Sequence, residues 1–231
     1  MAFRYSPRIV NDGLVFCLDA KNKNSYPGSG LTTSNILDKS QKGTLENGVT
    51  ITDNAFDFGG DDDYINFGDI NNANGDTPFS YGCWFNADTF VGFDMLMGKY
   101  EWNSSHGWYI FTNGNKLMYL LGPVGAFIRK TTIQTFETGR WYHAFVTYDG
   151  SRDISGFKMY INGIEDLSMI NNSVFGAGPV ENNFDFVIGC SSEGANGFFN
   201  GKIANVSIYN RELTPQEILQ NYNTLKGRYG L

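Results

Sequence analysis

The chain has 231 residues, of which 41% are hydrophobic and 16% aromatic, and its 17 basic and 24 acidic residues give a net charge of −7. This aromatic-rich composition excludes a disordered chain, and the acidic balance argues against nucleic acid as a partner, because nucleic acid needs a basic surface. A chain of this length fits a single all-β domain and needs neither disulfides nor metal to hold its core.

A periodicity of two, typical of β-strands, runs along most of the chain. Short alternating or apolar runs bounded by Gly, Asn and Asp predict strands at residues 13–19, 48–52, 55–58, 64–67, 79–87, 95–99, 108–112, 116–121, 127–132, 142–149, 157–161, 184–189 and 199–209. Residues 20–48 are polar without a sustained period, so we expect a long surface excursion there. Asn113-Gly114 and Asn162-Gly163 predict tight hairpin turns, because Asn and Gly accept a positive φ.

The segment 79–87 has one strongly apolar face, which we expect to fill the core. That face comprises Phe79, Tyr81, Cys83 and Phe85. Trp84 lies on the other face, and we expect Trp84 and Trp141 to be buried, since large aromatic side chains dominate sandwich cores. His143, two residues after Trp141, is interpreted as a hydrogen-bonded core or edge histidine.

One helix is predicted, over residues 214–226. Thr214 as N-cap, Pro215 as first helical residue and Glu217 two positions later form a capping box. Gly227 stands where a C-cap belongs. The apolar stripe expected to pack on the sandwich comprises Ile218, Leu219, Tyr222 and Leu225.

Together these elements predict an all-β fold in which two antiparallel sheets form a β-sandwich with one short C-terminal α-helix. We expect an N-terminal arm, residues 1–12, followed by a single domain, residues 13–231, that includes the helix. No segment predicts membrane insertion: residues 117–128 form the longest apolar-leaning run, and crossing a bilayer takes about 20. The start of the chain lacks the apolar stretch of a secretory leader, so we expect no signal peptide.

The three cysteines predict no redox or catalytic chemistry. Cys17, Cys83 and Cys190 sit among apolar residues and form no C-x-x-C pair, so we expect buried, reduced thiols. Such thiols fit folding in a reducing compartment. A catalytic cysteine would need His106 or His143 as its partner, because the chain has no other histidine.

Four segments, in chain order, resemble motifs of laminin-G-like, concanavalin-A-like domains. They are Phe56–Phe67, Phe79–Phe85, Trp141–Gly150 with Met159–Gly163, and Gly201–Ile218. The resemblance spans nearly the whole chain, from residue 13 to 226, and implies a concanavalin-A-like jelly roll.

Further segments resemble free-standing members of this family encoded by tailed bacteriophages. They are Ser6–Ala20, Ser25–Gly30 and Glu217–Asn223. The resemblance implies a protein of the virion surface, either a capsid decoration or a tail-fibre component. Such a protein is made in the host cytoplasm, contacts other virion proteins, and is present as a homo-oligomer or in many copies.

Catalysis is not predicted. Sandwich glycosidases related to this family place acidic residues in an E-x-D-x-x-E pattern on one strand, which sets two carboxylates about 5–5.5 Å apart, and no glutamate here begins such a pattern. Glu165 and Asp166 are adjacent and would point to opposite faces of a strand. A serine nucleophile would lack the G-x-S-x-G elbow.

A calcium site is one interpretation of the acidic turn at residues 61–63. Carboxylate oxygens suit Ca²⁺, and Asp62 and Asp63 are the candidate ligands, with Asp19, Asp57 and Asp69 as potential neighbours. Many members of the resembled family hold calcium. However, Gly59 and Ala204 stand where that family has aspartates, and a solvated loop is the alternative.

The candidate ligand-binding segment is 100–108, between two predicted strands. It combines aromatic rings for stacking on a sugar with polar groups for its hydroxyls; the candidate contacts are Tyr100, Trp102, Asn103 and His106. The alternative is that Trp102 and Trp108 cover one end of the sandwich or pack against a neighbouring subunit.

Two functions therefore remain open. One is a non-enzymatic structural module on a virion, attached through residues 1–8 and exposed loops. The other is a lectin-like adhesin that binds host-surface polysaccharide, and the two can coexist. A glycoside hydrolase is the least favoured reading.

Overall fold

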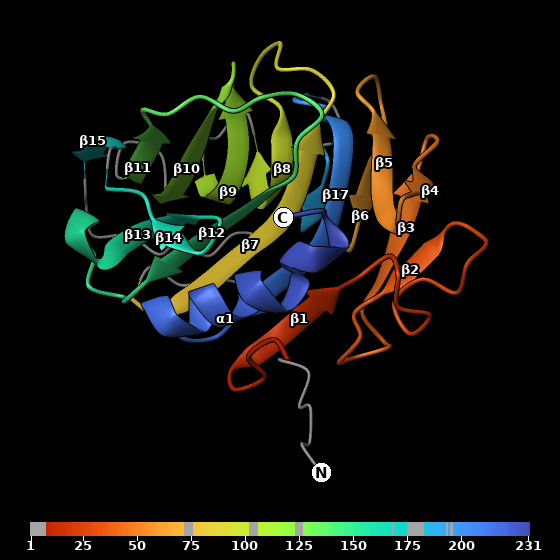
Figure 1. The fold of residues 1–231 in the computed structure, drawn as a ribbon, viewed down its shortest axis with the longest axis horizontal. Coiled ribbons are helices and arrows are strands. Elements are labelled where there is room, and N and C mark those ends of the chain that lie inside the picture. The colour runs from red at the N-terminus through yellow and green to blue at the C-terminus, as the bar shows by residue number, and fades with distance from the viewer. Residues whose placement is uncertain are drawn as a thin grey trace.

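The computed structural model describes residues 8–71, 76–101, 106–122, 127–167, 169–174, 183–192, 194 and 196–231. Two antiparallel sheets pack face to face, and helix α1 (Pro215–Leu225) lies across the outer side of one of them (Figure 1). The predicted all-β sandwich with one C-terminal helix is therefore confirmed. Within the described residues, no helix is long and apolar enough to cross a membrane.

Sheet A has eight strands and carries the helix. Its order is β14 (Ile164–Glu165), β13 (Phe157–Ile161), β12 (Tyr142–Tyr148), β7 (Phe79–Ala87), β17 (Asn200–Tyr209), β5 (Ala55–Gly59) and β4 (Thr50–Thr52), with β1 (Leu14–Leu18) also paired to β17. A short 3₁₀ helix, η1 (Ile154–Gly156), precedes β13.

Sheet B has nine strands. Its order is β15 (Met169–Val174), β11 (Phe127–Thr132), β10 (Lys116–Gly122), β9 (His106–Asn113), β8 (Met95–Glu101), β16 (Val187–Ile188), β6 (Tyr64–Asn66), β3 (Lys42–Glu46) and β2 (Thr32–Ser34).

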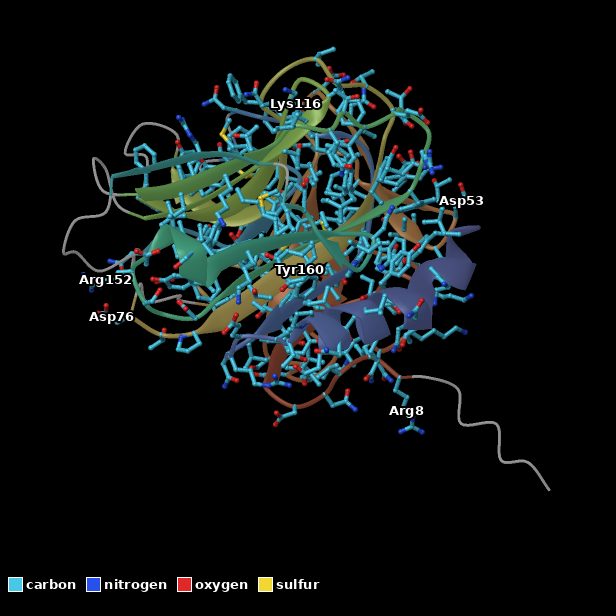
Figure 2. All side chains as sticks on the ribbon, turned by 60° about the vertical axis from the view of Figure 1, so that its left-hand side comes forward. Arg8, Asp53, Asp76, Lys116, Arg152 and Tyr160 are labelled. Atoms are coloured by element: carbon cyan, nitrogen blue, oxygen red, sulfur yellow. The ribbon has the colours of Figure 1, made fainter. Side chains whose placement is uncertain are left out.

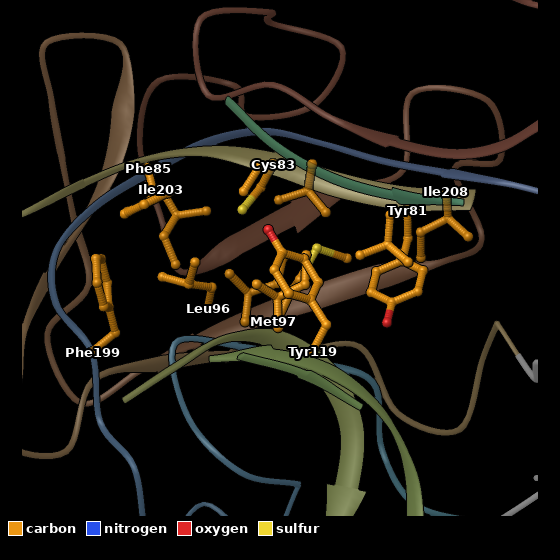
Figure 3. Packing of buried hydrophobic residues seen from close by; sticks show 14 of the residues in the cluster. Tyr81, Cys83, Phe85, Leu96, Met97, Tyr119, Phe199, Ile203 and Ile208 are labelled. Atoms are coloured by element: carbon orange, nitrogen blue, oxygen red, sulfur yellow. The ribbon is translucent and has the colours of Figure 1, made fainter. Parts of the chain in front are cut away.

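The space between the sheets is filled by large apolar side chains. Tyr81 and Phe85 of β7 face Met97 of β8 and Tyr119 of β10 across this layer (Figure 3). Each of these side chains is fully buried, and burying a side chain of this size stabilises the fold by about 1.5–3 kcal/mol. The predicted inward face of residues 79–87 is confirmed.

A second apolar layer joins helix α1 to the outer face of sheet A. Trp84 of β7 is fully buried there, and its ring stacks on Tyr222 of α1 and on Tyr229 at centroid distances of 5.5 and 4.4 Å. Ile218 and Leu225 complete the buried side of the helix. The helix thus docks through aromatic stacking as well as through its own apolar residues.

The predicted helix stripe is wrong at one position. Leu219 is 43% exposed, whereas Asn221 is buried. The Asn221 side chain accepts a hydrogen bond from the Val10 backbone N–H (2.8 Å) and donates one to the Tyr209 hydroxyl (3.0 Å). Such bonds offset the cost of removing a buried amide from water. Asn221 can therefore point inward, and its bond to the Val10 N–H holds residue 10 against the helix.

The capping box at the start of α1 is confirmed. The Thr214 hydroxyl accepts from the Glu217 N–H (3.3 Å), and the Glu217 carboxylate accepts from the Thr214 N–H (2.9 Å). The glycine C-cap is wrong: Lys226 is the C-cap in helical conformation, and a 3₁₀ turn, η2 (Lys226–Arg228), takes up Gly227.

Replacing Thr214 with alanine is expected to lower the free energy of unfolding by about 1 kcal/mol, because the Glu217 N–H loses its acceptor. Urea denaturation followed by fluorescence measures the change. Thr224→Ala is the matched control, since Thr224 is a partly exposed residue inside the same helix whose hydroxyl donates to the Gln220 carbonyl. Equal losses in both variants would contradict the cap assignment.

The long surface excursion expected at residues 20–48 is wrong, because strands β2 and β3 lie there and extend sheet B. These strands are short and polar, so their sequence shows no period. Between them, directly after β2, Asn35 is fully buried and bonds to β1: its side chain accepts from the Cys17 N–H (3.0 Å) and donates to the Val15 carbonyl (3.0 Å). Strands β14 and β15 were also not expected, and of residues 184–189 just 187–188 form a strand.

Ion pairs join loops that are distant in sequence. Arg152, after β12, pairs with Asp76, before β7, and the two side chains lie together at one end of the sandwich (Figure 2). Lys99 of β8 points between the sheets with 1% exposure and pairs with Asp69. Arg228 pairs with Asp19 at 2.8 Å.

Candidate functional site

A polar groove with a volume of about 440 Å³ lies at the edge of sheet A, where β12 begins and the β13–β14 hairpin turns. One wall is the loop before β12 and the other is the hairpin. The polar side chains lining this groove are Gln134, Thr135, Glu137, Arg140, Asn162, Glu165 and Asp166. Its apolar lining comprises Phe136, Tyr142, Ile161 and Ile164.

The hairpin wall is shaped by Asn162 and Gly163. Both have positive φ values, 53° and 80°, as a two-residue hairpin turn requires. The Asn162 side chain accepts from the His143 N–H (2.9 Å), which holds the turn against β12. A Cβ at position 163 would lie 3.0 Å from Leu219 of α1. The predicted turn is confirmed, and it also lets the hairpin approach the helix.

The loop wall is held by an aromatic pair. Phe136 and Tyr142 meet edge to face with ring centroids 4.9 Å apart, and the Tyr142 hydroxyl accepts from the Glu137 N–H (3.1 Å). The Arg140 guanidinium lies 5.7 Å from the centre of the Tyr142 ring. This contact places the Arg140 guanidinium, a cationic hydrogen-bond donor, over the Tyr142 ring at the edge of the groove.

The groove offers hydrogen-bond donors and acceptors in a small space. The Arg140 side chain is 55% exposed and its ion pair with Glu137, at 3.4 Å, is solvated, so the pair is worth under about 1 kcal/mol and does not lock the guanidinium. Across the groove, Glu165 is half-buried and Asp166 is buried. Amides, carboxylates and a guanidinium above apolar side chains match a ligand that has many hydroxyls and an apolar ring face.

Of the ligand contacts predicted in segment 100–108, the structure describes one side chain, that of Tyr100. Tyr100, in β8, is buried, and its ring packs edge to face on Tyr109 at 4.3 Å. Trp102 and Asn103 lie outside the described residues. His106 begins β9 opposite Glu101, and its side chain also lies outside the description. That these four residues contact a glycan stays a prediction.

The aspartates predicted as calcium ligands, Asp62 and Asp63, differ in their surroundings. Asp62 is exposed, whereas Asp63 is 9% exposed and accepts from the Gly59 N–H at 2.5 Å. In the part of the chain that the structure describes, no group of three or more His, Cys, Asp or Glu could hold a metal ion. Ca²⁺ also takes backbone carbonyl and water oxygens, so calcium binding by Asp62 and Asp63 stays a prediction.

The neighbouring aspartates have other contacts. Asp19 pairs with Arg228 and Asp69 with Lys99. These interactions direct both carboxylates toward cationic side chains rather than toward the 61–63 turn.

The cysteines are buried thiols outside any disulfide, as predicted. Burial raises the pKa of the Cys17 thiol to about 12 and raises that of Cys83 further, so neither is a thiolate at neutral pH. His143 is also buried, and desolvation lowers its pKa to about 3. Its Nδ1 has no hydrogen-bond partner, which corrects the interpretation of a hydrogen-bonded histidine.

The polar groove was not found from the sequence. The adjacent acids Glu165 and Asp166, expected to point to opposite faces of a strand, both line the groove: Glu165 ends β14 and Asp166 follows it. Arg140 and Gln134 lie in a loop between predicted strands and carry no motif. The one usable signal was Asn162-Gly163, which fixes the hairpin that forms the second wall.

A family model described as the concanavalin A-like lectin/glucanases superfamily matches residues 58–219, more than half of the chain. Among solved structures, the binding domain of Paraclostridial Mosquitocidal Protein 1 is similar, with 17% identity, a TM-score of 0.68, and coverage of 92% of this chain and 52% of that one. Trypanosoma rangeli sialidase in complex with sialic acid is 16% identical, with a TM-score of 0.69 and coverage of 94% of this chain and 33% of that one.

Domain 4 of AbnA, a GH43 extracellular arabinanase from Geobacillus stearothermophilus, in complex with arabinotriose, is 19% identical with a TM-score of 0.65. The alignment covers 90% of this chain and 98% of that one. At these identities the likenesses show the fold alone. The chain spans about half of the mosquitocidal binding-domain structure and a third of the sialidase. A comparison with curated protein sequences found no match.

Proposed function

Because this chain belongs to the concanavalin A-like lectin/glucanase superfamily, we propose that it is a non-enzymatic binding domain that recognises carbohydrate through the polar groove. Membership also confirms the family resemblance of the four motif segments. The observation that carries the proposal is the groove itself, where Arg140, Glu165 and Asp166 surround an aromatic and aliphatic floor.

The chemistry of the groove supports a sugar ligand over other small molecules. A sugar ring has an apolar face that packs on side chains such as Tyr142 and Ile161, and hydroxyls that both donate and accept hydrogen bonds. Among the similar folds, domain 4 of AbnA was solved with arabinotriose. That domain has nearly the length of this chain, so it supports the idea that a sandwich of this size binds an oligosaccharide on its own.

The proposal of a non-enzymatic role rests on the acidic residues of the sequence. Glycosidases need two carboxyl groups that flank one scissile bond, and no glutamate of this chain begins the E-x-D-x-x-E pattern that supplies them in sandwich glycosidases. In the groove, Glu137 is 75% exposed at the loop wall and Asp166 is buried at the hairpin wall. We assign these carboxylates to hydrogen bonding with a bound sugar.

We further propose that this domain acts on the surface of a bacteriophage virion, beside other virion proteins and in several copies. The support is the resemblance of Ser6–Ala20 and Glu217–Asn223 to phage-encoded members of the family. An acidic chain with a net charge of −7 fits a role that does not involve nucleic acid. Particles purified by density, with the chain present in fixed stoichiometry to the capsid protein, would support this location; its absence from them would refute it.

Arg140→Ala is expected to weaken binding of a neutral oligosaccharide by about 10- to 150-fold, because a charge-assisted hydrogen bond contributes about 1.5–3 kcal/mol. A glycan array with the purified chain finds the sugar, with arabinotriose included as a probe, and isothermal titration calorimetry measures the affinity. Glu165→Gln tests the opposite wall in the same way. Arg152→Ala is the matched control, since Arg152 pairs with Asp76 away from the groove.

Trp102→Ala separates this site from segment 100–108. Loss of affinity in Arg140→Ala with normal affinity in Trp102→Ala supports the groove. The reverse pattern places the sugar at segment 100–108 and overturns the groove assignment. A chain that binds no glycan on the array, with or without added calcium, contradicts the proposed function itself.

A further inference from the structure

A second cavity, the helix pocket, lies where the C-terminal end of α1 meets β1 and β17, and it has a volume of about 410 Å³. Strand β1 contributes Leu14 and Cys17, β17 contributes Asn205, and α1 contributes Thr224 and Leu225. Sites for small molecules usually have volumes of about 300–1,000 Å³. No residue lines both this pocket and the polar groove, so the two cavities are separate.

An irregularity in β17 brings Asn205 into the lining of the helix pocket. Between Ala204 and Ser207 the pairing of β17 with β7 shifts its register, because β17 has one residue more than β7 there. This is a β-bulge, a feature that redirects side chains next to binding sites. Val206 keeps its place in the core between the sheets. Asn205 takes a φ of 45°, in the left-handed region that asparagine accepts more readily than most residues.

The side-chain amide of Asn205 is unpaired, although the residue is 8% exposed. Among the described residues neither its Oδ1 nor its Nδ2 makes a hydrogen bond, and neither atom is closed off from water. The open surface of this amide therefore faces the helix pocket, which the residue lines. By contrast, the buried amides of Asn35 and Asn221 both donate and accept hydrogen bonds. Buried polar side chains are nearly always paired, so the Asn205 amide indicates a ligand.

The charged groups around the helix pocket are already neutralised or solvated. The Asp19 side chain is 8% exposed and pairs with the Arg228 guanidinium at 2.8 Å. Arg8 is exposed, so water solvates its charge. Burial raises the pKa of the Cys17 thiol to about 12, and the thiol is therefore uncharged at neutral pH. An ion beside Asn205 would lose its hydration without gaining an unpaired counter-ion, which favours an uncharged ligand.

The shape of the Asn205 amide defines the group that pairs with it. Its carbonyl oxygen accepts and its NH₂ donates, and the two lie on one edge. A primary carboxamide or a lactam presents a matching N–H and C=O on one edge, whereas a trans peptide bond holds these two groups on opposite sides. The apolar lining is aliphatic and comprises Ile9, Leu14, Ile36, Leu37 and Leu225.

We propose that the helix pocket binds a small uncharged molecule that carries a primary carboxamide or lactam group on an apolar body. Asn205 accepts from the ligand N–H through Oδ1 and donates to the ligand carbonyl through Nδ2. The body packs on the aliphatic side chains of Leu14, Leu37 and Leu225. This site is independent of sugar recognition in the polar groove.

The test compares three probes of nearly equal size that differ in the group offered to Asn205. They are 3-phenylpropanamide, 4-phenylbutan-2-one, which has a methyl group in place of the amide NH₂, and 3-phenylpropanoate, which is charged. Each is titrated into the isotope-labelled full chain, and NMR follows the side-chain NH₂ signals. The pair of signals lost in Asn205→Gly identifies Asn205. We expect the amide to shift this pair and to bind about tenfold more tightly than the ketone, a difference of about 1.4 kcal/mol.

Asn205→Gly removes the amide and keeps the backbone conformation, because glycine adopts a φ of 45° freely. In this variant the tenfold difference between the amide and the ketone should disappear. Asn54→Gly is the matched control, since Asn54 has a φ of 64°, is exposed and does not line the pocket. Arg140→Ala should also leave the affinity for the amide unchanged, because Arg140 lines the polar groove.

Four results would overturn the proposal. They are equal binding of the amide and the ketone to the native chain, tightest binding of the carboxylate, a difference that persists in Asn205→Gly, and no binding of any probe. Tightest binding of the carboxylate would assign the pocket to an anion held by Arg8 or Arg228 instead. None of these results bears on the glycan affinity of the polar groove, which is measured separately.

Discussion

Replacing Trp84 with alanine is expected to lower the free energy of unfolding by about 3–5 kcal/mol. Trp84 has no exposed surface, and it is the side chain of sheet A on which Tyr222 and Tyr229 stack. Its removal leaves a cavity beneath α1 that two rigid tyrosine rings cannot fill by small shifts. The loss therefore includes the burial of the indole and the docking of the C-terminal segment.

Guanidinium denaturation measured by far-UV circular dichroism gives the free energy. Trp141→Ala is the matched control. Trp141 is partly exposed, and its ring packs on Tyr229 with centroids 4.5 Å apart, whereas Trp84 is fully buried and stacks on both Tyr222 and Tyr229. We expect the control to lose less than half as much, and Trp84→Phe to retain part of the stacking. A Trp84→Ala loss no larger than that of Trp141→Ala would show that α1 is held elsewhere.

The parts of the fold that the sequence predicted are those with strong local patterns. In residues 79–87 the alternation is clear because one face meets sheet B and Trp84 meets the helix. The helix start was predictable because a capping box is a local arrangement of Thr214 and Glu217 that works in any context.

The parts that were missed depend on tertiary contacts. Strands β2 and β3 are short and half-exposed, so their side chains carry no period, and their position depends on bonds from buried Asn35 to β1. The inward turn of Asn221 likewise depends on Val10, which lies far away in sequence. No local rule gives an asparagine such a position.

The candidate site was harder to predict than the fold for the same reason. Gln134, Arg140 and Glu165 come from a loop and a hairpin that meet only in the folded chain. Composition instead favours segment 100–108, which combines aromatic and polar residues. Tyr100 shows the weakness of that argument: it lies in β8, and packing on Tyr109 buries its ring.

Acid is expected to destabilise the fold through His143. Its neighbours are the rings of Trp84, Phe145 and Tyr222, so the imidazolium has no counter-ion and the folded-state pKa falls from 6.5 to about 3. Below pH 6.5 the unfolded chain binds a proton at this site and the folded chain does not. Stability therefore falls as the pH is lowered from about 6.5 toward 3, by about 2 kcal/mol between pH 7 and pH 5.

Two carboxyl groups with shifted pKa values also contribute. The Arg211 side chain holds the pKa of Glu217 down at about 2, compared with 4.5 in the absence of its partners, so the stability that Glu217 contributes is present above pH 4.5 and is lost as the pH falls toward 2. Burial raises the pKa of Asp94, so its protonation makes stability rise as the pH is lowered and opposes the effect of His143. His143 and His106 are the two histidines in the chain, and variants of each separate the histidine contribution from that of these carboxyl groups.

The measurement is urea denaturation of the native chain, His143→Phe and His106→Gln at pH 7 and pH 5. Phenylalanine fills a similar volume among the same aromatic rings and removes a buried polar nitrogen that has no partner, so we expect His143→Phe to cost little at pH 7. Its stability should change little between the two pH values, whereas His106→Gln should keep the native slope. If His143→Phe still loses about 2 kcal/mol at pH 5, burial of this imidazole is not the origin of the acid sensitivity.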